Sequence, residues 1–97
     1  MAAANETIHQ TVRLKVMAAL TALPGGQKGL DFTRLKQLTG ATDGNLGSHI
    51  DTLAKAGYVE VEKTFLARRP KTIVKATAAG RKAFSEHVAF LREVLGR

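Results

Sequence analysis

Apolar residues recur at helical spacing along the first quarter of the chain, on two sides of the same segment. One set comprises Ile8, Val12, Val16, Ala19 and Leu23, and a second comprises Leu14, Met17 and Ala18. Because a period of 3.6 residues indicates an α-helix, the pattern predicts one helix over about 6–23, with Asn5 as its N-cap. Both of its apolar sides need a neighbour to pack against.

The segment 24–29, PGGQKG, interrupts this pattern and predicts a loop, because glycine and proline break regular structure. Leu30 follows as a very short predicted strand. Asp31 can cap a second short helix that ends at Gly40. The apolar face of this helix comprises Phe32, Leu35 and Leu38. A tight corner then leads to Thr42, which can cap a third helix.

The third predicted helix, 43–56, turns one narrow apolar stripe inward. That stripe is Leu46, Ile50 and Leu53; the residues that project away from it are Gly44, Asn45, Ser48, Asp51, Thr52 and Lys55, with Gly47 and His49 on its flanks. Each interior glycine weakens a helix by about 1 kcal/mol relative to alanine, so Gly44 and Gly47 need an explanation. Close approach of the second helix explains them, and so does close approach of a DNA backbone.

After Gly57 the period changes to two, which predicts a β-hairpin. Val59, Val61 and Phe65 alternate with Glu60, Glu62 and Thr64, as expected of a strand with one buried face. The segment ARRPK at 67–71 predicts the turn, and 72–76 predicts the returning strand. Thr77 then caps a last helix over 78–95. Its inner stripe is Phe84, Val88, Leu91 and Leu95, and a second stripe is Ala83, Phe90 and Val94.

The predicted order is helix, helix, short turn, helix, two-stranded hairpin and helix. This is the layout of a winged helix-turn-helix, a mainly α fold with a small β-hairpin. At 97 residues the chain has the size of a single domain, 1–97. In such a fold the third helix enters the major groove of DNA, and the hairpin, or wing, extends along the backbone or into the neighbouring minor groove.

Charge supports a polyanionic partner. Fifteen Lys and Arg against eight Asp and Glu give a net charge of +7, which favours nucleic acid first and an anionic membrane surface second. Between 63 and 75 the chain has five basic residues and no acidic one. Lysine and arginine also protect exposed strand edges from aggregation, so a solubilised hairpin is the alternative explanation.

Several classes of function lack the residues that they need. The chain has no cysteine, which excludes disulfides, thiol catalysis and cysteine-ligated metals. His9, His49 and His87 have no paired ligand spacing, and 24–29 lacks the rest of a phosphate-binding loop. We therefore expect no enzymatic activity, no cofactor and no metal. The absence of a membrane span and of a signal-peptide pattern leads us to expect a cytoplasmic protein.

The chain also resembles a known family over 30–84. The most specific matching segments are TDGNL at 42–46, L-x-x-AGYV at 53–59, RRPKT at 68–72 and T-x-x-GRKAF at 77–84. In their combined order these segments resemble the compact winged-helix transcriptional regulators related to the MarR and ArsR groups. The resemblance implies a small homodimeric DNA-binding transcription factor, with the third helix on DNA and the terminal helices, 6–23 and 78–95, in the dimer. At Gly47 the chain departs from the family pattern, because relatives more often carry serine there. The glycine lacks the hydroxyl with which a serine could contact DNA.

Position on the predicted elements assigns the candidate DNA contacts. On the recognition helix, the candidates for base-edge or groove-wall contact are Asn45, Ser48, His49 and Thr52. On the wing, 63–75, the candidates for phosphate or minor-groove contact are Lys63, Arg68, Arg69 and Lys71. Phosphate contacts with weaker support are Arg34, Lys36 and Lys55, because exposed basic residues are often only solvated.

The second apolar stripes of the terminal helices predict a two-fold dimer, since a monomer would expose them. The candidate interface residues are Leu14, Met17, Phe90 and Val94, which could instead pack together within one chain. A small-molecule effector is not indicated by any residue, and its pocket, if there is one, is expected at the dimer interface.

Three functions remain in order of preference. The first is a sequence-specific regulator that binds double-stranded DNA. The second is a winged-helix protein-interaction module without specific DNA binding. The third is a binder of double-stranded RNA or of DNA in general.

Overall fold

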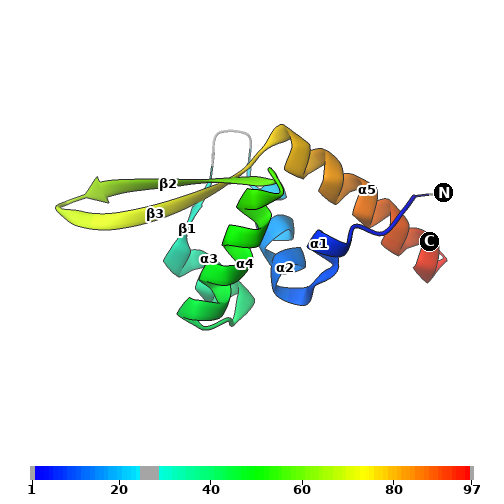
Figure 1. Ribbon diagram of the computed structural model, residues 1–97, viewed down its shortest axis with the longest axis horizontal. Helices are drawn as coiled ribbons and strands as arrows, with labels where there is room; N and C mark the ends of the chain where they lie inside the picture. The colour runs from blue at the N-terminus through cyan, green and yellow to red at the C-terminus, as the bar shows by residue number, and fades with distance from the viewer. Residues whose placement is uncertain (1, 25–28, 97) are drawn as a thin grey trace.

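The computed structural model describes residues 2–24 and 29–96. In chain order the elements are α1 (Glu6–His9), α2 (Thr11–Thr21), β1 (Leu30–Asp31), α3 (Phe32–Thr39), α4 (Asp43–Lys55), β2 (Val59–Leu66), β3 (Arg69–Ala76) and α5 (Ala78–Leu95). This order confirms the mainly α fold with a small sheet (Figure 1). Most of the predicted loop 24–29 lies outside the described residues.

Four predicted N-caps are confirmed. In each case the cap's side-chain oxygen accepts a hydrogen bond from the backbone N–H three residues further on, which satisfies a donor that the helix itself leaves unpaired. The caps are Asn5 of α1, Asp31 of α3, Thr42 of α4 and Thr77 of α5. Gly40 ends α3 in the left-handed conformation, with φ +71°, as its position predicts.

The single helix predicted over 6–23 is wrong, because Gln10 divides it into α1 and α2. Gln10 has extended backbone angles, φ −64° and ψ 136°, and its side chain caps α2 by accepting from Arg13 N–H. In one continuous helix, Ile8 and Met17 are nine positions apart and would point in opposite directions. The break turns α1, so that both side chains are fully buried in one core.

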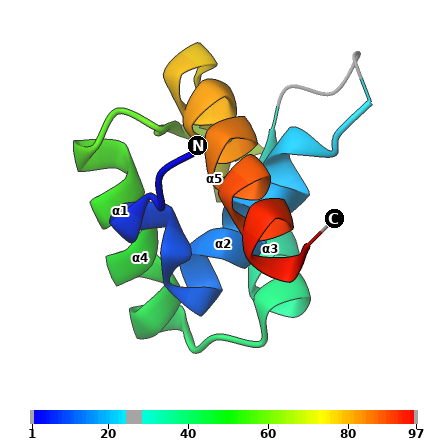
Figure 2. The same ribbon diagram turned by 90° about the vertical axis from the view of Figure 1, so that its right-hand side faces the viewer.

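The helix α2 is the centre of the molecule, because it contacts α3, α4, α5 and β3. Viewed end-on, it lies between α4 and α3 and below α5 (Figure 2). The core that these elements enclose includes Val16, Met17, Leu20, Leu35, Leu46, Ile50, Leu53, Val59 and Val74. Leu38, placed by its spacing on the apolar face of α3, is 43% exposed instead.

The sheet is antiparallel in the order β1–β3–β2, and β2 and β3 form a long hairpin. Its turn is only Ala67 and Arg68, both with positive φ, so the five-residue turn predicted at 67–71 is wrong. Val61 and Phe65, expected to be buried, are 40% and 74% exposed. The alternation predicts a common face correctly, but the hairpin projects past the helices that cover this face (Figure 1).

At the other end of the molecule, α5 runs beside α1 and the N-terminal segment (Figures 1 and 2). His87 of α5 is fully buried, and its ring lies edge-on to that of His9, with centroids 5.2 Å apart. The sequence places these two histidines on different helices, and their contact is a product of the tertiary fold. Within the described ranges, no helix is long and apolar enough to cross a bilayer.

Candidate nucleic-acid interface

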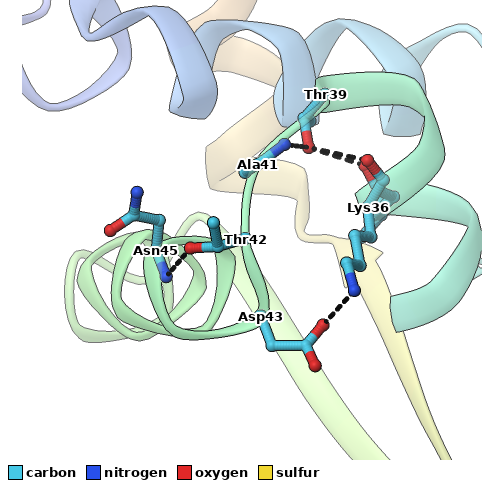
Figure 3. Close-up of polar contacts among 7 residues, drawn as sticks. Lys36, Thr39, Ala41, Thr42, Asp43 and Asn45 are labelled. Carbon is cyan, nitrogen blue, oxygen red and sulfur yellow. Dashed lines mark hydrogen bonds and ion pairs between the residues drawn. The ribbon is translucent and has the colours of Figure 1, made fainter.

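The corner between α3 and α4 is fixed by short-range polar contacts (Figure 3). The hydroxyl of Thr39 donates to the carbonyl of Leu35 at 2.8 Å and accepts from the N–H of Ala41 at 3.3 Å. Across the corner, Lys36 Nζ lies 2.8 Å from Asp43 Oδ1 in an exposed ion pair. These contacts fix the angle at which α4 leaves the corner, and they give the candidate phosphate contact Lys36 an acidic partner.

The outer face of α4 is exposed, as the sequence predicts. Leu46, Ile50 and Leu53 are buried, and the face away from them carries the exposed side chains of Asn45, Ser48, Thr52 and Lys55. The hydroxyl of Thr52 donates to the carbonyl of Ser48 at 3.1 Å, so its oxygen remains available as an acceptor. The amide of Asn45 has no hydrogen-bond partner among the described residues, because only its backbone N–H is used, by the Thr42 cap, so the amide can offer both a donor and an acceptor.

His49, another candidate contact on α4, is half-buried and fixed to α2. Arg13 Nη1 donates to its Nδ1 at 2.9 Å, which places the ring proton on Nε2. Burial, and then the charge of Arg13, lower the pKa of His49, so the ring is neutral near pH 7. Its remaining nitrogen is therefore a hydrogen-bond donor. Arg13 also donates from Nε to the carbonyl of Thr7, and nothing in the sequence pattern singles it out.

The two glycines of α4 are not required by packing within the chain. A Cβ added at Gly44 or Gly47 would have no neighbouring atom within 4 Å. Close approach of the second helix, one of the two explanations offered by the sequence, is therefore wrong. The fold leaves both positions open on the surface of α4.

The tip of the wing carries exposed arginines, and its base carries ion pairs. Arg68 and Arg69 are exposed at the turn, in line with the sequence. Lys71 lies 3.5 Å from Asp31 Oδ2, so this candidate phosphate contact already has a carboxylate partner. Only Lys63, Arg68 and Arg69 of the four wing candidates form no ion pair within the described part of the chain.

Between the wing and α3 lies an open cleft with a volume of about 580 Å³. Its lining includes Arg34 and Gln37 from α3 and Arg69 and Thr72 from β3. Arg34 Nη1 donates to Gln37 Oε1 at 3.3 Å, which holds the guanidinium along the helix. Gln37 and Thr72 are absent from the sequence-based candidates, because uncharged residues on separate elements give no signal before the fold is known.

The helix α4 and the wing, formed by β2 and β3, lie at the same end of the molecule. Figure 1 shows the hairpin projecting beyond α3 and α4, whereas α5 and both termini extend in the opposite direction. This is the arrangement in which one duplex can touch both elements.

The four candidate dimer residues have different environments. Met17 is fully buried in the core of the single chain. The prediction that it lies in an exposed dimer interface is therefore wrong. Leu14 is half-buried and packs against the core, and Phe90 stacks on His87 with ring centroids 5.7 Å apart. Val94 is 65% exposed, as is its neighbour Leu95 at 66%. An exposed apolar surface therefore remains at the end of α5.

Comparisons with known proteins agree with the winged-helix fold of this chain. Residues 12–95 match the family described as winged helix DNA-binding domain. An uncharacterized protein of Methanocaldococcus jannaschii is 38% identical over 80 residues, which cover 82% of this chain and 83% of that protein.

Solved structures with a similar fold include two regulators. A transcriptional regulator homologue from Pyrococcus horikoshii is 28% identical with a TM-score of 0.82, over 95% of this chain and 87% of that one. A MarR-like transcription regulator from Bacillus cereus is 24% identical with a TM-score of 0.62, over 94% of this chain and 68% of that one. The latter likeness concerns the fold alone.

Proposed function

The chain belongs to the family of winged helix DNA-binding domains, and we propose that it is a regulator rather than an enzyme and that it recognises a specific sequence of double-stranded DNA. The observation that supports this proposal most directly is the joint position of α4 and the wing at one end of the molecule (Figure 1). No other element of the described chain covers the polar face of α4.

In the proposed complex, α4 enters the major groove, which is wide enough to admit a helix. The amide of Asn45 can pair with the two hydrogen-bonding groups of adenine, and Ser48 and Thr52 can contact base edges or the groove wall. The Nε2–H of His49 adds a donor whose direction Arg13 fixes. The bare surface at Gly44 and Gly47 lets the helix backbone come close to the DNA, which supports the DNA explanation of these glycines.

The wing supplies contacts that do not depend on base sequence. Arg68 and Arg69 reach a phosphate or the minor groove, since the guanidinium fits both. Arg34, in the cleft beside the wing, would hold another phosphate, and Lys55, at the end of α4, would hold a further one. Lys36 and Lys71 contribute less, because each is paired with a carboxylate.

We further propose a two-fold homodimer through the terminal elements. Val94 and Leu95 are exposed at the end of α5, and a second copy would remove this apolar surface from water. Leu14 and Phe90 can extend the interface, but Met17 cannot. The two recognition helices would then face half-sites about one helical turn apart in a near-palindromic sequence. We also propose a cytoplasmic location for this regulator.

Selection from a random-sequence library, followed by salt-dependent binding measurements, tests the proposal. We expect a consensus palindrome. Asn45→Ala should change the preferred sequence, and Arg69→Ala should weaken binding to all sequences and reduce its salt dependence. Lys82→Ala is a matched control, because Lys82 is exposed on α5 and belongs to neither α4 nor the wing.

Four outcomes contradict parts of this proposal. Uniform weak binding without a consensus indicates a general nucleic-acid binder, and no binding at low salt indicates a protein-interaction module. Equal losses for Asn45→Ala and Arg69→Ala on every sequence contradict the division between base and backbone contacts. A monomer in light scattering at micromolar concentration contradicts the dimer.

A further inference from the structure

The wing has two exposed faces beyond the core, and the strand register assigns the residues of each. Cross-strand partners in an antiparallel pair point to the same side of the sheet. The inner face therefore comprises the pairs Val61 with Val74, Lys63 with Thr72, and Phe65 with Pro70. The outer face comprises Glu60 with Lys75, Glu62 with Ile73, and Thr64 with Lys71, and it continues to Arg69 at the tip.

The outer face is electrostatically balanced. Glu62 Oε2 lies 2.6 Å from Lys75 Nζ, and this contact lowers the pKa of Glu62 and raises that of Lys75. Lys71 is paired with Asp31, and Glu60 adds a further negative charge. Cations that already have carboxylate partners, next to acidic side chains, form a poor surface for phosphates.

The inner face has the opposite character. It carries no acidic residue, and Lys63 forms no ion pair with any described residue. Phe65 is 74% exposed and Val61 is 40% exposed. A large apolar side chain in this position promotes aggregation unless something covers it, so its exposure on a projecting hairpin indicates a missing partner.

The direction of the inner face identifies where that partner lies. Val59 and Val74, at the base of the same face, are buried in the core with residues of α4. The inner face is thus the side of the wing that faces the helix-turn-helix, and a duplex seated on α4 would lie against it.

Charge selects DNA over a second copy of the hairpin. Lys63 lies on the same face as Phe65, and Arg68 and Arg69 lie close to it along the chain at the tip. These cations would repel the same residues of another wing, whereas they attract phosphates. Deoxyribose rings and the walls of the minor groove offer apolar surface between those phosphates, and apolar side chains are known to wedge there.

We propose that, apart from the arginines at its tip, the wing contacts DNA with its inner face alone, with Phe65 packed against the sugars or the minor-groove wall and Lys63 on a neighbouring phosphate. This inference rests on the proposed function, and it assigns no direct contact to the outer face below the tip, which comprises Glu60, Glu62, Thr64, Ile73 and Lys75. It also predicts that Phe65 contributes affinity that salt does not screen, because no charge is involved.

The chain contains no tryptophan, so a single one reports its own surroundings. Full-length Phe65→Trp is titrated with the selected DNA site and compared with Thr64→Trp, whose side chain lies on the outer face one residue away. We expect quenching and a blue shift for Phe65→Trp and no change for Thr64→Trp. Equal changes at both positions, or none at Phe65→Trp despite bound DNA, overturn the inference.

Affinity gives a second measurement. Phe65→Thr keeps a residue that favours strands, and we expect it to weaken specific binding about tenfold with an unchanged salt slope. Lys63→Gln should reduce the salt slope by about one, and Lys75→Gln should leave it unchanged. Thermal unfolding should be the same for all three variants.

The outcomes separate this inference from the proposed function. Wild-type affinity in Phe65→Thr, with specific binding otherwise intact, overturns the inference and leaves the proposed function in place. A change in oligomeric state instead of affinity assigns the inner face to a second copy and also overturns it. Absence of specific binding by the unaltered protein contradicts the proposed function itself.

Discussion

The backbone N–H of Asn5 donates a hydrogen bond to Nδ1 of His87 at 3.0 Å, across 82 residues of sequence. Because a backbone N–H can only donate, Nδ1 carries no proton, and the ring proton is on Nε2, 3.2 Å from Nδ1 of His9. The side chain of Asn5 also donates to the hydroxyl of Tyr58 at 2.9 Å. The N-terminal segment is thus joined to both α5 and the start of β2 through neutral partners.

Stability should fall as the pH drops below about 6.5, because His87 resists protonation in the folded chain. Burial, and then the neighbouring His9, lower its pKa, and Glu6 only partly opposes them. The unfolded chain therefore binds more protons than the folded chain in this window, and the free energy of unfolding rises with pH. Urea unfolding at about pH 7.5 and about pH 5.5 measures the difference.

The pKa of His49 is lowered too, so the comparison is made in a His49→Gln background. There, His87→Gln should reduce the remaining pH dependence, since its amide oxygen can still accept from Asn5 N–H but does not titrate. An unchanged pH dependence in the double variant contradicts the role assigned to His87.

The caps show what the sequence predicts well. Asp31, Thr42 and Thr77 each act on a backbone N–H three residues away, so the information is local and survives any tertiary arrangement. Gln10 is the contrary case. Its extended backbone is imposed by the burial of Ile8 and Met17 in one core, and the local sequence around it carries no breaker residue.

The candidate site also contains residues whose environment the local sequence predicts and residues whose environment depends on the tertiary fold. The exposure of Asn45 and Ser48 follows from helical spacing and is confirmed. The exposure of Phe65 does not follow from the alternation of β2, because alternation predicts which side chains share a face but not how far the core extends beneath it. The ion pair of Lys71 with Asp31, 40 residues away, depends on strand pairing that no local pattern encodes.

Asp31 should matter to stability mainly as a cap. Its Oδ1 accepts from Arg34 N–H at 2.7 Å, and its Oδ2 is the more distant partner of Lys71. Asp31→Ala should cost about 1 kcal/mol, whereas Asp31→Asn, which keeps the cap, should cost only a few tenths at most, about the value of an exposed ion pair. Urea unfolding distinguishes them, and equal losses would show that the ion pair dominates.

Gly80 should tolerate no side chain. A Cβ at this position would overlap the carbonyl of Tyr58, with its carbon only 2.8 Å away, because α5 begins directly against the segment that precedes β2. Gly80→Ala should therefore destabilise the fold by about 1–3 kcal/mol, the usual cost of overpacking. Thermal unfolding measures the loss. Ala79→Gly, at an exposed neighbouring position, controls for helix propensity, and a neutral Gly80→Ala contradicts the close approach.

Gly47 should behave in the opposite way. An added Cβ would meet nothing, so Gly47→Ala should stabilise the free protein by about 1 kcal/mol through helix propensity alone. If the open surface serves close approach to DNA, the same variant should bind the selected site more weakly. Binding by fluorescence anisotropy beside urea unfolding gives both signs, and a gain in stability without a loss in affinity contradicts this role of the glycine.

The turn of the wing should show the same exchange between stability and binding. Ala67 and Arg68 have φ of +51° and +65°, a conformation that costs a residue with a side chain about 1 kcal/mol and glycine almost nothing. Arg68→Gly should therefore raise the free energy of unfolding while it weakens DNA binding and lowers the salt slope by about one. Ala67→Gly is the matched control, because it relieves the same strain and removes no charge. It should be stabilised equally and bind DNA as the unaltered chain does. If both variants lost affinity alike, the stiffness of the turn rather than the charge of Arg68 would be what the DNA requires.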